Sequence, residues 1–376
     1  MAELLTNTTD LTKVASAIRE KGGTSDSLVY PDGFVTAIQA IQTGTELKII
    51  VTVKSGATVT ATKGSLSVSG TSVNGTCTLT VPEAGTWSVK ATLSGQTSDT
   101  KSATFTDSYA LSLSFVSAVL NNNDWATIKS VSDKGDGANY WSIGDRKAVT
   151  LNGTVGALTL SNYTTYAFII GFNHNSSVEG ANRIHFQLAK TALSGGTDVA
   201  LCDSKYNSQV SATGYFSMNS NATNSGGWNS SQMRTKICGT SLSSYSGTII
   251  AVIPAALRAV LKSVTKYTDN TGSSSSDASA VTATTDYFFL LSEYEVFGTI
   301  SRGNPNEASK QAQYSYYSAG NSKVKYNHSA TSTAVVWWLR SPFAGNSTYF
   351  TLVIPDGAAS NADAYYSIGF APGFCV

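Results

Sequence analysis

The sequence ends with an apolar stretch, IGFAPGFCV at residues 368–376, which directly follows the polar stretch GAASNADAYYS at residues 357–367. The polar stretch mixes small residues with two tyrosines and shows neither the helix period nor the strand period. The apolar stretch has the composition of a buried element. We therefore expect residues 368–376 to belong to the core. The identities of residues 357–367, in contrast, are expected to be only loosely constrained by packing.

A second apolar stretch, WWLRSP at residues 337–342, lies upstream of the polar stretch. We predict that it forms a strand, in which the neighbouring Trp337 and Trp338 point to opposite faces of a sheet. One indole can then enter the main core while the other packs into a second layer. We interpret both tryptophans as structural, and a ligand-stacking pair is the alternative.

The composition excludes several classes of protein. Only 13% of the 376 residues are charged, and the net charge is +1 without a basic cluster, so we expect no nucleic-acid partner. No run of about 18 apolar residues occurs, which predicts no membrane insertion. The first residues, MAELLTNTTDLTK, lack the basic and apolar regions of a secretion signal. The four cysteines match no zinc or disulfide spacing, and we expect buried free thiols, consistent with assembly in a reducing cytoplasm.

The N-terminal residues 1–44 predict two short helices separated by the turn VYPDG. Two such helices bury too little surface to be stable alone, so we expect them to need a partner or symmetry mates. A loosely packed N-terminal arm is the alternative. Their apolar residues are Leu11, Val14, Ala15, Ile18, Phe34, Val35, Ile38 and Ile41.

The following residues, 45–107, alternate between apolar and polar with a period of two, as in ELKIIVTVKSG and TWSVKATL. Several short alternating strands over this length predict a small β-sandwich of immunoglobulin-like type. No polar cluster interrupts its faces, so we expect it to serve as a spacer.

The large domain, residues 108–376, contains many short apolar segments separated by loops rich in Ser, Asn and Gly. We predict one clear helix at PAALRAVLKSVTKY, residues 254–267, and a flexible surface loop at TDNTGSSSSDASAVTATTD, residues 268–286. The predicted fold class of the whole chain is α+β and multidomain.

Motifs for catalysis and for metal binding are weak. His174, His185 and His328 lie in unrelated contexts; the first two could come together, but no Cys or carboxylate stands at ligand spacing. Glu293 and Glu295 stand two apart on one face of a predicted strand, which leaves paired carboxylates for glycoside hydrolysis open. The same segment, LLSEYEVFG, is equally typical of a half-exposed strand. We therefore predict no catalytic residue, no metal and no cofactor.

Aspartates in the stretch SDKGDGANYWSIGD have a simpler explanation than calcium binding. Asp133, Asp136 and Asp145 do not follow the order of an EF-hand loop, because Lys134 interrupts it. We interpret these aspartates as turn residues.

The N-terminal pattern DLTKVASAIREKGGTSDSLVYPDGFVTAIQAI resembles a short segment at the N-terminus of phage and prophage tail proteins from Gram-positive bacteria. The resemblance covers about 35 residues. It implies that this part joins the protein to other tail proteins and carries no chemistry.

The large domain resembles a second family over about 250 residues in consistent order. GGWNSSQMRT, VIPAALRAVLKSVTKYT, DYFFLLSEYEVFG, YYSAGNSKVKYN, WWLRSP and GFAPGFCV together are similar to the C-type-lectin-fold proteins diversified by retroelements in gut bacteria and their phages. In that family, error-prone reverse transcription at adenines rewrites a C-terminal segment while the scaffold stays fixed. The resemblance implies a variable region at about residues 343–370.

The composition of the C-terminus fits this resemblance. Changing the adenines of an Asn codon cannot yield Lys, Glu, Gln, Met or Trp, which together make up 43 of the 376 residues. At that frequency the 34 residues from Phe343 to Val376 would hold about four of them, and they hold none. A buried, loop-rich segment would avoid the same residues, and that alternative stays open.

Departures from related lectin-fold proteins limit what the resemblance implies. Calcium-dependent sugar-binding lectins use Glu-Pro-Asn or Gln-Pro-Asp beside a Trp-Asn-Asp strand, whereas this chain has only GNPNE, residues 303–307. Calcium-mediated sugar binding is therefore not expected. The formylglycine-generating enzymes of the same fold rely on reactive cysteines, and Cys375 has no cysteine near it in sequence.

These resemblances imply a non-enzymatic adhesin of a phage tail tip, assembled in the host cytoplasm and located in the virion tail. We expect it to bind a bacterial surface receptor, protein or glycan, and to form a homotrimer. A bacterially encoded binding protein of the same fold and a surface-glycan hydrolase are the alternatives. The residues expected to contact ligand are Phe343, Ala344, Asn346, Thr348, Tyr349, Thr351, Asn361, Asp363, Tyr365 and Tyr366.

Overall fold

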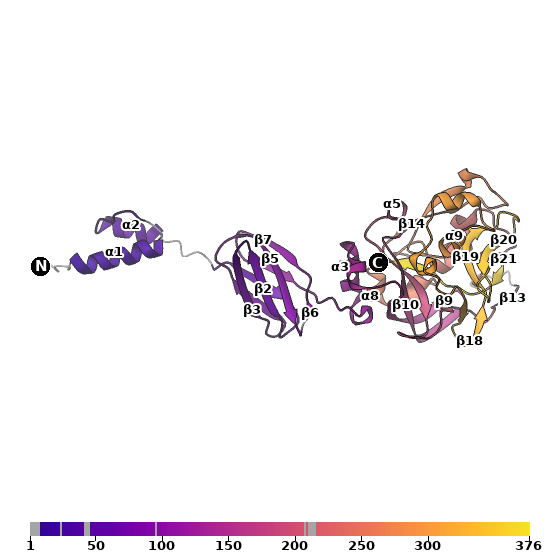
Figure 1. The fold of residues 1–376 in the computed structure, drawn as a ribbon, viewed down its shortest axis with the longest axis horizontal. Coiled ribbons are helices and arrows are strands. Elements are labelled where there is room, and N and C mark those ends of the chain that lie inside the picture. Colours follow the sequence, from indigo (N-terminus) through magenta and orange to yellow (C-terminus); the bar gives the residue numbers. More distant parts are fainter. Residues whose placement is uncertain (1–7, 23–24, 41–45, 95, 207, 210–215) are drawn as a thin grey trace. The chain divides into compact units, whose positions relative to one another are not determined.

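The computed structural model describes residues 8–22, 25–40, 46–94, 96–206, 208–209 and 216–376 (Figure 1). The chain divides into two compact units, residues 1–115 and 116–376. The fold is mixed α+β, with most regular structure in β-sheets and few helices. No helix within the described ranges is long and apolar enough to cross a membrane.

The two predicted N-terminal helices are present as α1 (Thr8–Gly22) and α2 (Asp32–Ala40). Their shared core is small and consists of Ala15, Ile18 and Phe34. The predicted apolar residue Ile41 lies outside the described residues. Three other apolar residues remain about half exposed, at 48%, 50% and 53%, and these are Val14, Val35 and Ile38. The pair thus leaves much of its apolar surface uncovered.

The rest of the first unit consists of two sheets around one core. One sheet contains β4 (Thr76–Thr80), β1 (Lys48–Thr52) and β8 (Tyr109–Ser112). The other contains β2 (Thr58–Lys63), β3 (Leu66–Thr71), β5 (Gly85–Leu93), β6 (Gln96–Thr97) and β7 (Lys101–Phe105). The alternation in the sequence puts every second side chain inside, with Trp87 fully buried.

The predicted boundary between residues 107 and 108 is too early. Strand β8 pairs in parallel with β1, from Ile49 opposite Tyr109 to Thr52 opposite Ser112. These residues therefore complete a sheet of the first unit, which extends to Phe115.

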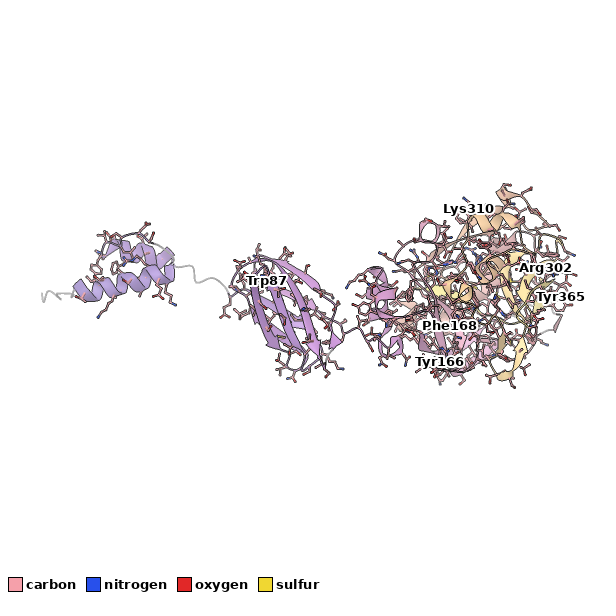
Figure 2. All side chains as sticks on the ribbon, viewed as in Figure 1. Trp87, Tyr166, Phe168, Arg302, Lys310 and Tyr365 are labelled. Atoms are coloured by element: carbon pink, nitrogen blue, oxygen red, sulfur yellow. The ribbon has the colours of Figure 1, made fainter. Side chains whose placement is uncertain are left out.

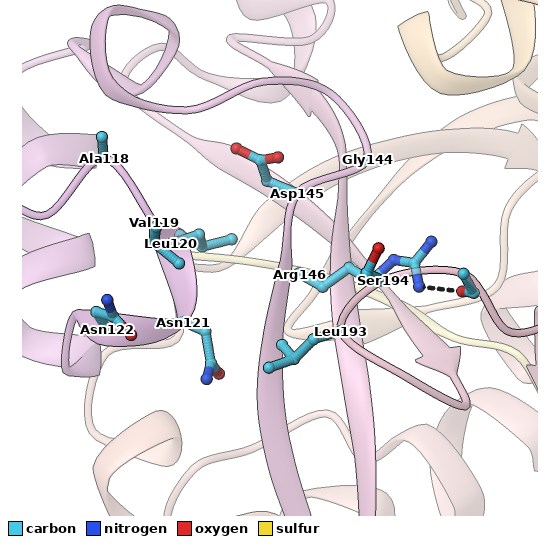
Figure 3. A pocket seen from close by; sticks show the side chains of 11 residues that line it. Ala118, Val119, Leu120, Asn121, Asn122, Gly144, Asp145, Arg146, Leu193 and Ser194 are labelled. Carbon is cyan, nitrogen blue, oxygen red and sulfur yellow. Dashed lines mark hydrogen bonds between the residues drawn. The ribbon is translucent and has the colours of Figure 1, made fainter.

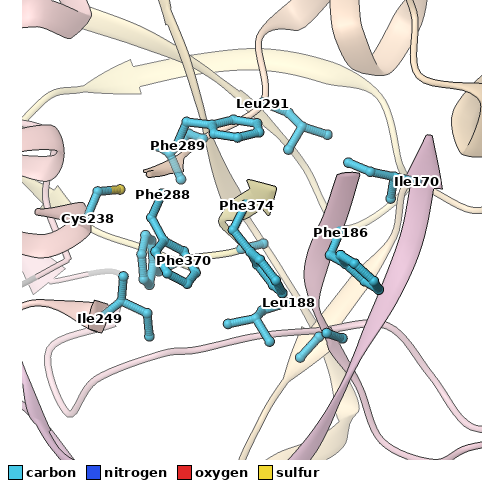
Figure 4. Close-up of a cluster of buried hydrophobic side chains, with 14 of the residues drawn as sticks. Ile170, Phe186, Leu188, Cys238, Ile249, Phe288, Phe289, Leu291, Phe370 and Phe374 are labelled. Carbon is cyan, nitrogen blue, oxygen red and sulfur yellow. The ribbon is translucent and has the colours of Figure 1, made fainter. Parts of the chain in front are cut away.

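The core of the second unit is built on a five-stranded antiparallel sheet. In spatial order it contains β16 (Phe288–Phe289), β23 (Gly373–Cys375), β11 (Ile184–Lys190), β10 (Leu158–Phe172) and β9 (Arg146–Val155). The C-terminal strand β23 lies between two others, and its Phe374 packs against Phe186 and Phe288 with ring centroids 5.3 and 5.2 Å apart (Figure 4). The prediction that the apolar end is core is therefore confirmed.

A second, three-stranded sheet contains β19 (Trp337–Pro342), β20 (Tyr349–Val353) and β21 (Ala359–Asp363). Both tryptophans of β19 are fully buried. The indole N–H of Trp337 donates to the carbonyl of Lys323, and that of Trp338 to the carbonyl of Phe216. Their structural role is confirmed, because each indole packs against a different part of the domain.

The remaining strands of the second unit pair into three small sheets. Together with the α-helices of this unit they are α3 (Trp125–Asp133), α4 (Gly137–Tyr140), α5 (Ser176–Glu179), α6 (Gly227–Ser230), α7 (Ile249–Val252), α8 (Ala255–Arg258), α9 (Glu293–Phe297), α10 (Ser315–Ser318), β12 (Val199–Ala200), β13 (Ser208–Gln209), β14 (Val264–Asp269), β15 (Val281–Asp286), β17 (Lys325–Asn327), β18 (Ala330–Val335) and β22 (Tyr366–Ser367). All four cysteines are buried and free, as predicted.

Two secondary-structure predictions are wrong. The expected helix at 254–267 is limited to α8, and from Val264 the chain forms β14, where β-branched residues favour a strand. The expected loop at 268–286 is only partly irregular, because its first two residues end β14 and its last six form β15, which pairs with β14 along six residues. The helical spacing of the apolar residues continues to Val264, but pairing of Val264–Asp269 with β15 overrides it.

A third prediction, the strand around Glu293 and Glu295, is also wrong. These residues open helix α9, whose N-cap Ser292 forms a capping box with Glu295. The Ser-x-x-Glu spacing is a known helix start signal, and it outweighs the short apolar run before it.

Candidate ligand-binding surface

The segment from Phe343 to Tyr366 consists of a loop, the hairpin of β20 and β21, and a short turn that leads into β22. Nine of the ten residues predicted to contact ligand are partly exposed. These nine are Phe343, Ala344, Asn346, Thr348, Tyr349, Asn361, Asp363, Tyr365 and Tyr366. The accessibility that a binding surface requires is present, and ligand binding by these residues stays a prediction.

Thr351 is the exception, and its prediction as a ligand contact is wrong. Its side chain is fully buried, and its Oγ1 donates to the carbonyl of Ser341 at 2.9 Å. Residues 350–353 of β20 are all buried, so both faces of the strand are covered along this stretch.

Four aromatic rings of the segment form what we term the aromatic cluster: Phe343, Tyr349, Tyr365 and Tyr366. Phe343 and Tyr349 stack with centroids 6.2 Å apart, and Tyr365 and Tyr366 stack at 5.1 Å. Asp363 lies opposite Tyr349 in the β20–β21 register. Partial desolvation and the carboxylate of Asp363 raise the pKa of Tyr365, to which Tyr366 and Tyr349 also contribute. Because Asp363 pairs with Tyr349 and the N–H of Ala364 donates to the carbonyl of Thr348, Tyr365 follows directly after the end of the hairpin that carries Tyr349.

A buried side chain that the sequence patterns did not single out holds the loop in place. Asn224 is fully buried, and its Nδ2 donates to three carbonyl oxygens of the loop. The acceptors, at 3.3, 2.9 and 2.8 Å, belong to Phe343, Asn346 and Tyr349. The backbone N–H of Asn224 also donates to the carbonyl of Ser347. Asn224 thus fixes the loop by binding only main-chain atoms of the loop, three of them with its side-chain amide.

Further main-chain hydrogen bonds fix both ends of the segment. The N–H of Ala344 donates to the carbonyl of Arg302 at 2.9 Å, and the N–H of Ala364 to the carbonyl of Thr348 at 2.9 Å. Within the loop, the Oδ1 of Asn346 accepts from both the N–H and the Oγ1 of Thr348. The exposed Asp356 acts similarly in the turn of the hairpin, where its Oδ1 accepts from the N–H of Ala358 at 2.8 Å. The contacts with Arg302 and Asn224, in contrast, involve only main-chain atoms of the segment.

Behind the segment lies a group of fully or almost fully buried charges, which we term the ion network: Glu179, Lys266, Glu295, Arg340 and the hydroxyl of Tyr314. Arg340, on β19, donates to both carboxylate oxygens of Glu295. The Nζ of Lys266 donates to Glu295 at 2.8 Å and to Glu179 at 2.6 Å. Two cations and two carboxyl groups are thereby joined away from water.

Burial raises the pKa values of the two glutamates, whereas the neighbouring cations lower them. Burial favours the neutral acid, but Arg340 and Lys266 hold the pKa of Glu295 well below its usual range. Burial raises the pKa of Glu179 to about 7, against the attraction of Lys266. Breaking either ion pair would leave an uncompensated buried charge, which is costly.

His174 and His185 come together beside the ion network, with ring centroids 5.5 Å apart. Both are buried, and neither Nε2 has a hydrogen-bond partner among the described residues. The Nδ1 of His185 lies 3.1 Å from the hydroxyl of Tyr314, so His185 is a buried, hydrogen-bonded histidine. Burial and the charge of Lys266 lower the pKa of His174 to about 3, so it is neutral.

These histidines do not fit a metal site, although one nitrogen of His174 and single oxygens of Glu179 and Glu295 lie within 4.8 Å of one another. The ammonium of Lys266 already binds both carboxylates, and Arg340 binds Glu295 as well. A divalent cation would therefore meet two positive charges in a low-dielectric interior.

The pair of glutamates considered for glycoside hydrolysis is inaccessible. Glu293 is 1% exposed and Glu295 is fully buried. Glu295 belongs to the ion network, and the carboxylate of Glu293 accepts hydrogen bonds from the backbone N–H groups of Ser301, Arg302 and Gly303. Neither carboxyl group reaches a surface on which a polysaccharide could lie.

The GNPNE stretch is likewise engaged in internal contacts. The Nδ2 of Asn304 donates to Asp269 at 3.0 Å, and the carboxyl group of Glu307 accepts from Ser341 at 2.6 Å. Both residues are fully buried. Of the three turn aspartates, Asp133 forms ion pairs with Lys129 and Lys262.

A pocket of about 360 Å³ lies elsewhere in the second unit (Figure 3). Residues 118–122, 144–146 and 193–195 line it, and none of them lies in the predicted variable region. Arg146 donates to the carbonyls of Ala192 and Gly195, so its guanidinium shapes one rim of the pocket. The pocket is thus separate from the aromatic cluster.

A second buried polar group surrounds Lys325, which is 1% exposed at the start of β17. Its Nζ lies 3.4 Å from the Oε1 of Gln187 and 3.9 Å from the Oδ2 of Asp198. Asp198 also forms an ion pair with the buried Lys190. Burial lowers the pKa of Lys325 to about 8. Asp198 opposes this shift, and the ammonium of Lys190, which shares the same carboxylate, adds to it.

We expect Lys325→Met to stabilise the second unit at pH 7 by about 1–3 kcal/mol, because it removes a poorly compensated buried charge. Between pH 8 and about 10.5 the unfolded wild-type chain binds a proton that the native state lacks, so the wild type gains stability as pH rises. The advantage of the variant should therefore disappear over that range. Urea unfolding at several pH values measures this, with the exposed Lys134→Met as control. An advantage that is the same at pH 7 and pH 10.5 would contradict the assignment.

Comparison with known protein families gives one match. Residues 204–376, a little under half of the chain, match the model of a domain of unknown function (DUF6273). The matched range includes the whole segment from Phe343 to Tyr366 together with Asn224, Glu295 and Arg340. No curated protein and no solved structure matches the chain.

Proposed function

We propose that this protein is a non-enzymatic adhesin of a phage or prophage tail tip, which binds a bacterial surface receptor through a diversified face. The observation that carries the proposal is that, in the segment from Phe343 to Tyr366, the scaffold binds the backbone while many side chains remain accessible. The side-chain amide of the scaffold residue Asn224 binds three carbonyl oxygens of this segment, while nine of its side chains are partly exposed. Side chains of this kind can change without loss of the fold.

The composition of the face suits recognition of a partner. Tyrosines supply rigid contact area at low entropic cost, and small polar residues supply adaptable hydrogen bonds, as in antibody loops. We propose that the second unit is a C-type-lectin-like domain diversified by a retroelement. A near-copy of the 3′ end of the coding sequence beside a reverse transcriptase gene would support this, and its absence would count against it.

The first unit supports a role in attachment and spacing. We propose that its sheets form an immunoglobulin-like spacer and that α1 and α2 join other tail proteins and assemble a homotrimer. The half-exposed Val14, Val35 and Ile38 favour assembly, because a soluble helix pair gains stability by covering such residues. Three copies would also raise the avidity of a weak single face.

The alternatives differ in what they predict. A bacterially encoded binding protein of the same fold would keep the binding face but lack neighbouring tail genes. A surface-glycan hydrolase would release reducing sugars from a polysaccharide. We do not favour a hydrolase, because the carboxyl groups of Glu293 and Glu295 are buried and internally paired.

The test of the proposal is truncation of the aromatic cluster. Replacing Tyr349 or Tyr365 by alanine should cost at least about 2 kcal/mol of binding free energy, or roughly 30-fold in affinity. Asn361→Ala, at the edge strand of the same hairpin, should cost less than about 1 kcal/mol. Binding to cells of a host strain found by screening is the readout, and thermal melting checks the fold. If the tyrosine variants keep full binding, the receptor contacts another part of the chain.

A further inference from the structure

Outside the predicted variable region, the short loop 300–303 is built unusually firmly. The buried carboxylate of Glu293 accepts from three consecutive backbone N–H groups, with shortest distances of 2.9, 3.1 and 2.7 Å to Ser301, Arg302 and Gly303. It also accepts from the Oγ of Ser301. A Cβ atom at Gly303 would lie 3.1 Å from the Cβ of Ser341, so the loop packs closely on β19. None of these contacts uses the side chain of Arg302.

This loop adjoins the start of the variable segment. The carbonyl of Arg302 accepts from the N–H of Ala344, the residue after Phe343 of the aromatic cluster. Figure 2 shows Arg302 and Tyr365 at the same end of the second unit. The side chain of Arg302 is exposed and forms no hydrogen bond or ion pair with any residue that the structure describes. An unengaged guanidinium therefore stands on a rigid loop beside the face.

We propose that Arg302 is a fixed cationic contact for an acidic group of the ligand, and that the ligand is an acidic polysaccharide. This inference rests on the proposed binding function of the face. A planar guanidinium binds carboxylate, sulfate or phosphate groups with two parallel hydrogen bonds. The residues from Phe343 to Val376 contain two aspartates and no Lys or Arg, so a positive charge at the face has to come from the scaffold.

The surface chemistry favours a glycan over a protein partner. None of the most exposed large apolar side chains among the described residues belongs to residues 300–303 or 343–366. Partly exposed tyrosine rings beside Asn, Thr and Asp side chains offer flat surfaces and hydrogen-bonding groups, which suit sugar rings and hydroxyls.

The experiment measures binding of the full chain to immobilised polymers: polygalacturonate, dextran sulfate and poly(glycerol phosphate), with neutral dextran as reference. We expect binding to at least one acidic polymer that weakens as NaCl rises. Arg302→Ala should weaken it at least about tenfold, because a hydrogen bond to a charged group is lost, whereas Arg302→Lys should retain part of it. Lys134→Ala is the matched control, since Lys134 is an exposed cation in the same unit. Which polymer binds distinguishes carboxylate, sulfate and phosphate.

The outcomes separate this inference from the function on which it rests. Loss of binding in Arg302→Ala, with unchanged melting temperature and an unaffected Lys134→Ala, supports the inference. Full binding by Arg302→Ala, equal binding to dextran, or binding to none of the acidic polymers overturns it. If the tyrosine variants lose binding to host cells while Arg302→Ala keeps it, the face binds a receptor of another class and only the acidic-glycan inference fails.

Discussion

Replacing Arg340 by methionine is expected to destabilise the second unit by about 3–5 kcal/mol, because it leaves a buried carboxylate without its main partner. Arg340 is fully buried on β19. Its guanidinium binds both oxygens of Glu295, the carbonyl of Leu290 and the Oγ1 of Thr268. The substitution therefore removes contacts to two separate parts of the chain at once, β14 and residues 290–295.

Urea unfolding of the full chain, followed by tryptophan fluorescence, measures the effect. The double variant Arg340→Met, Glu295→Gln should recover part of the loss, since it removes the unpaired charge. Arg302→Ala serves as the matched control, because it removes an exposed arginine with no side-chain partner among the described residues. If Arg340→Met costs no more than that control, the ion network does not hold the scaffold.

The ion network explains how a fixed scaffold can carry a loosely specified surface. Arg340 joins β19, which precedes the segment, to Glu295 at the start of α9 and to Thr268 on β14. On the other side, β23 inserts into the main sheet directly after the segment. Both ends of the segment are thus held by buried contacts, and its outward side chains contribute little to them.

Local sequence patterns were sufficient for the anchoring elements. The buried strand at the C-terminus, the two structural tryptophans and the two N-terminal helices each follow from apolar composition or period within a few residues. The pattern failed at residues 254–267, where Leu257, Val260 and Leu261 have helical spacing but pairing with β15 decides the conformation from Val264 onward. A strand partner about twenty residues away is not visible in a helical window.

The contacts that build the site could not be predicted from the sequence, because they join distant residues. Asn224 binds carbonyl groups about 120 positions away, and Lys266 joins Glu179 to Glu295. A single buried Asn or Lys has no local signature that distinguishes it from an exposed one. The partial exposure of Tyr349 and Tyr365 could be anticipated from composition. The burial of Thr351 depends on packing against both faces of β20, which the local sequence does not reveal.

The central claim is that binding specificity resides in the exposed side chains of residues 343–368 and not in the scaffold. Asn224 and Arg302 bind main-chain atoms of this segment and none of its side chains. The segment of a relative should therefore adopt the same backbone. The preference between two hosts should then change by at least roughly 100-fold when the segments are exchanged.

The most direct measurement is cell binding by the two reciprocal chimeras, in which this protein and a relative of different host range exchange residues 343–368. Thermal melting of both chimeras verifies that the scaffold stays folded. We predict that each chimera binds the host of the protein that donated the segment. Binding that stays with the host of the scaffold in both folded chimeras would contradict the account.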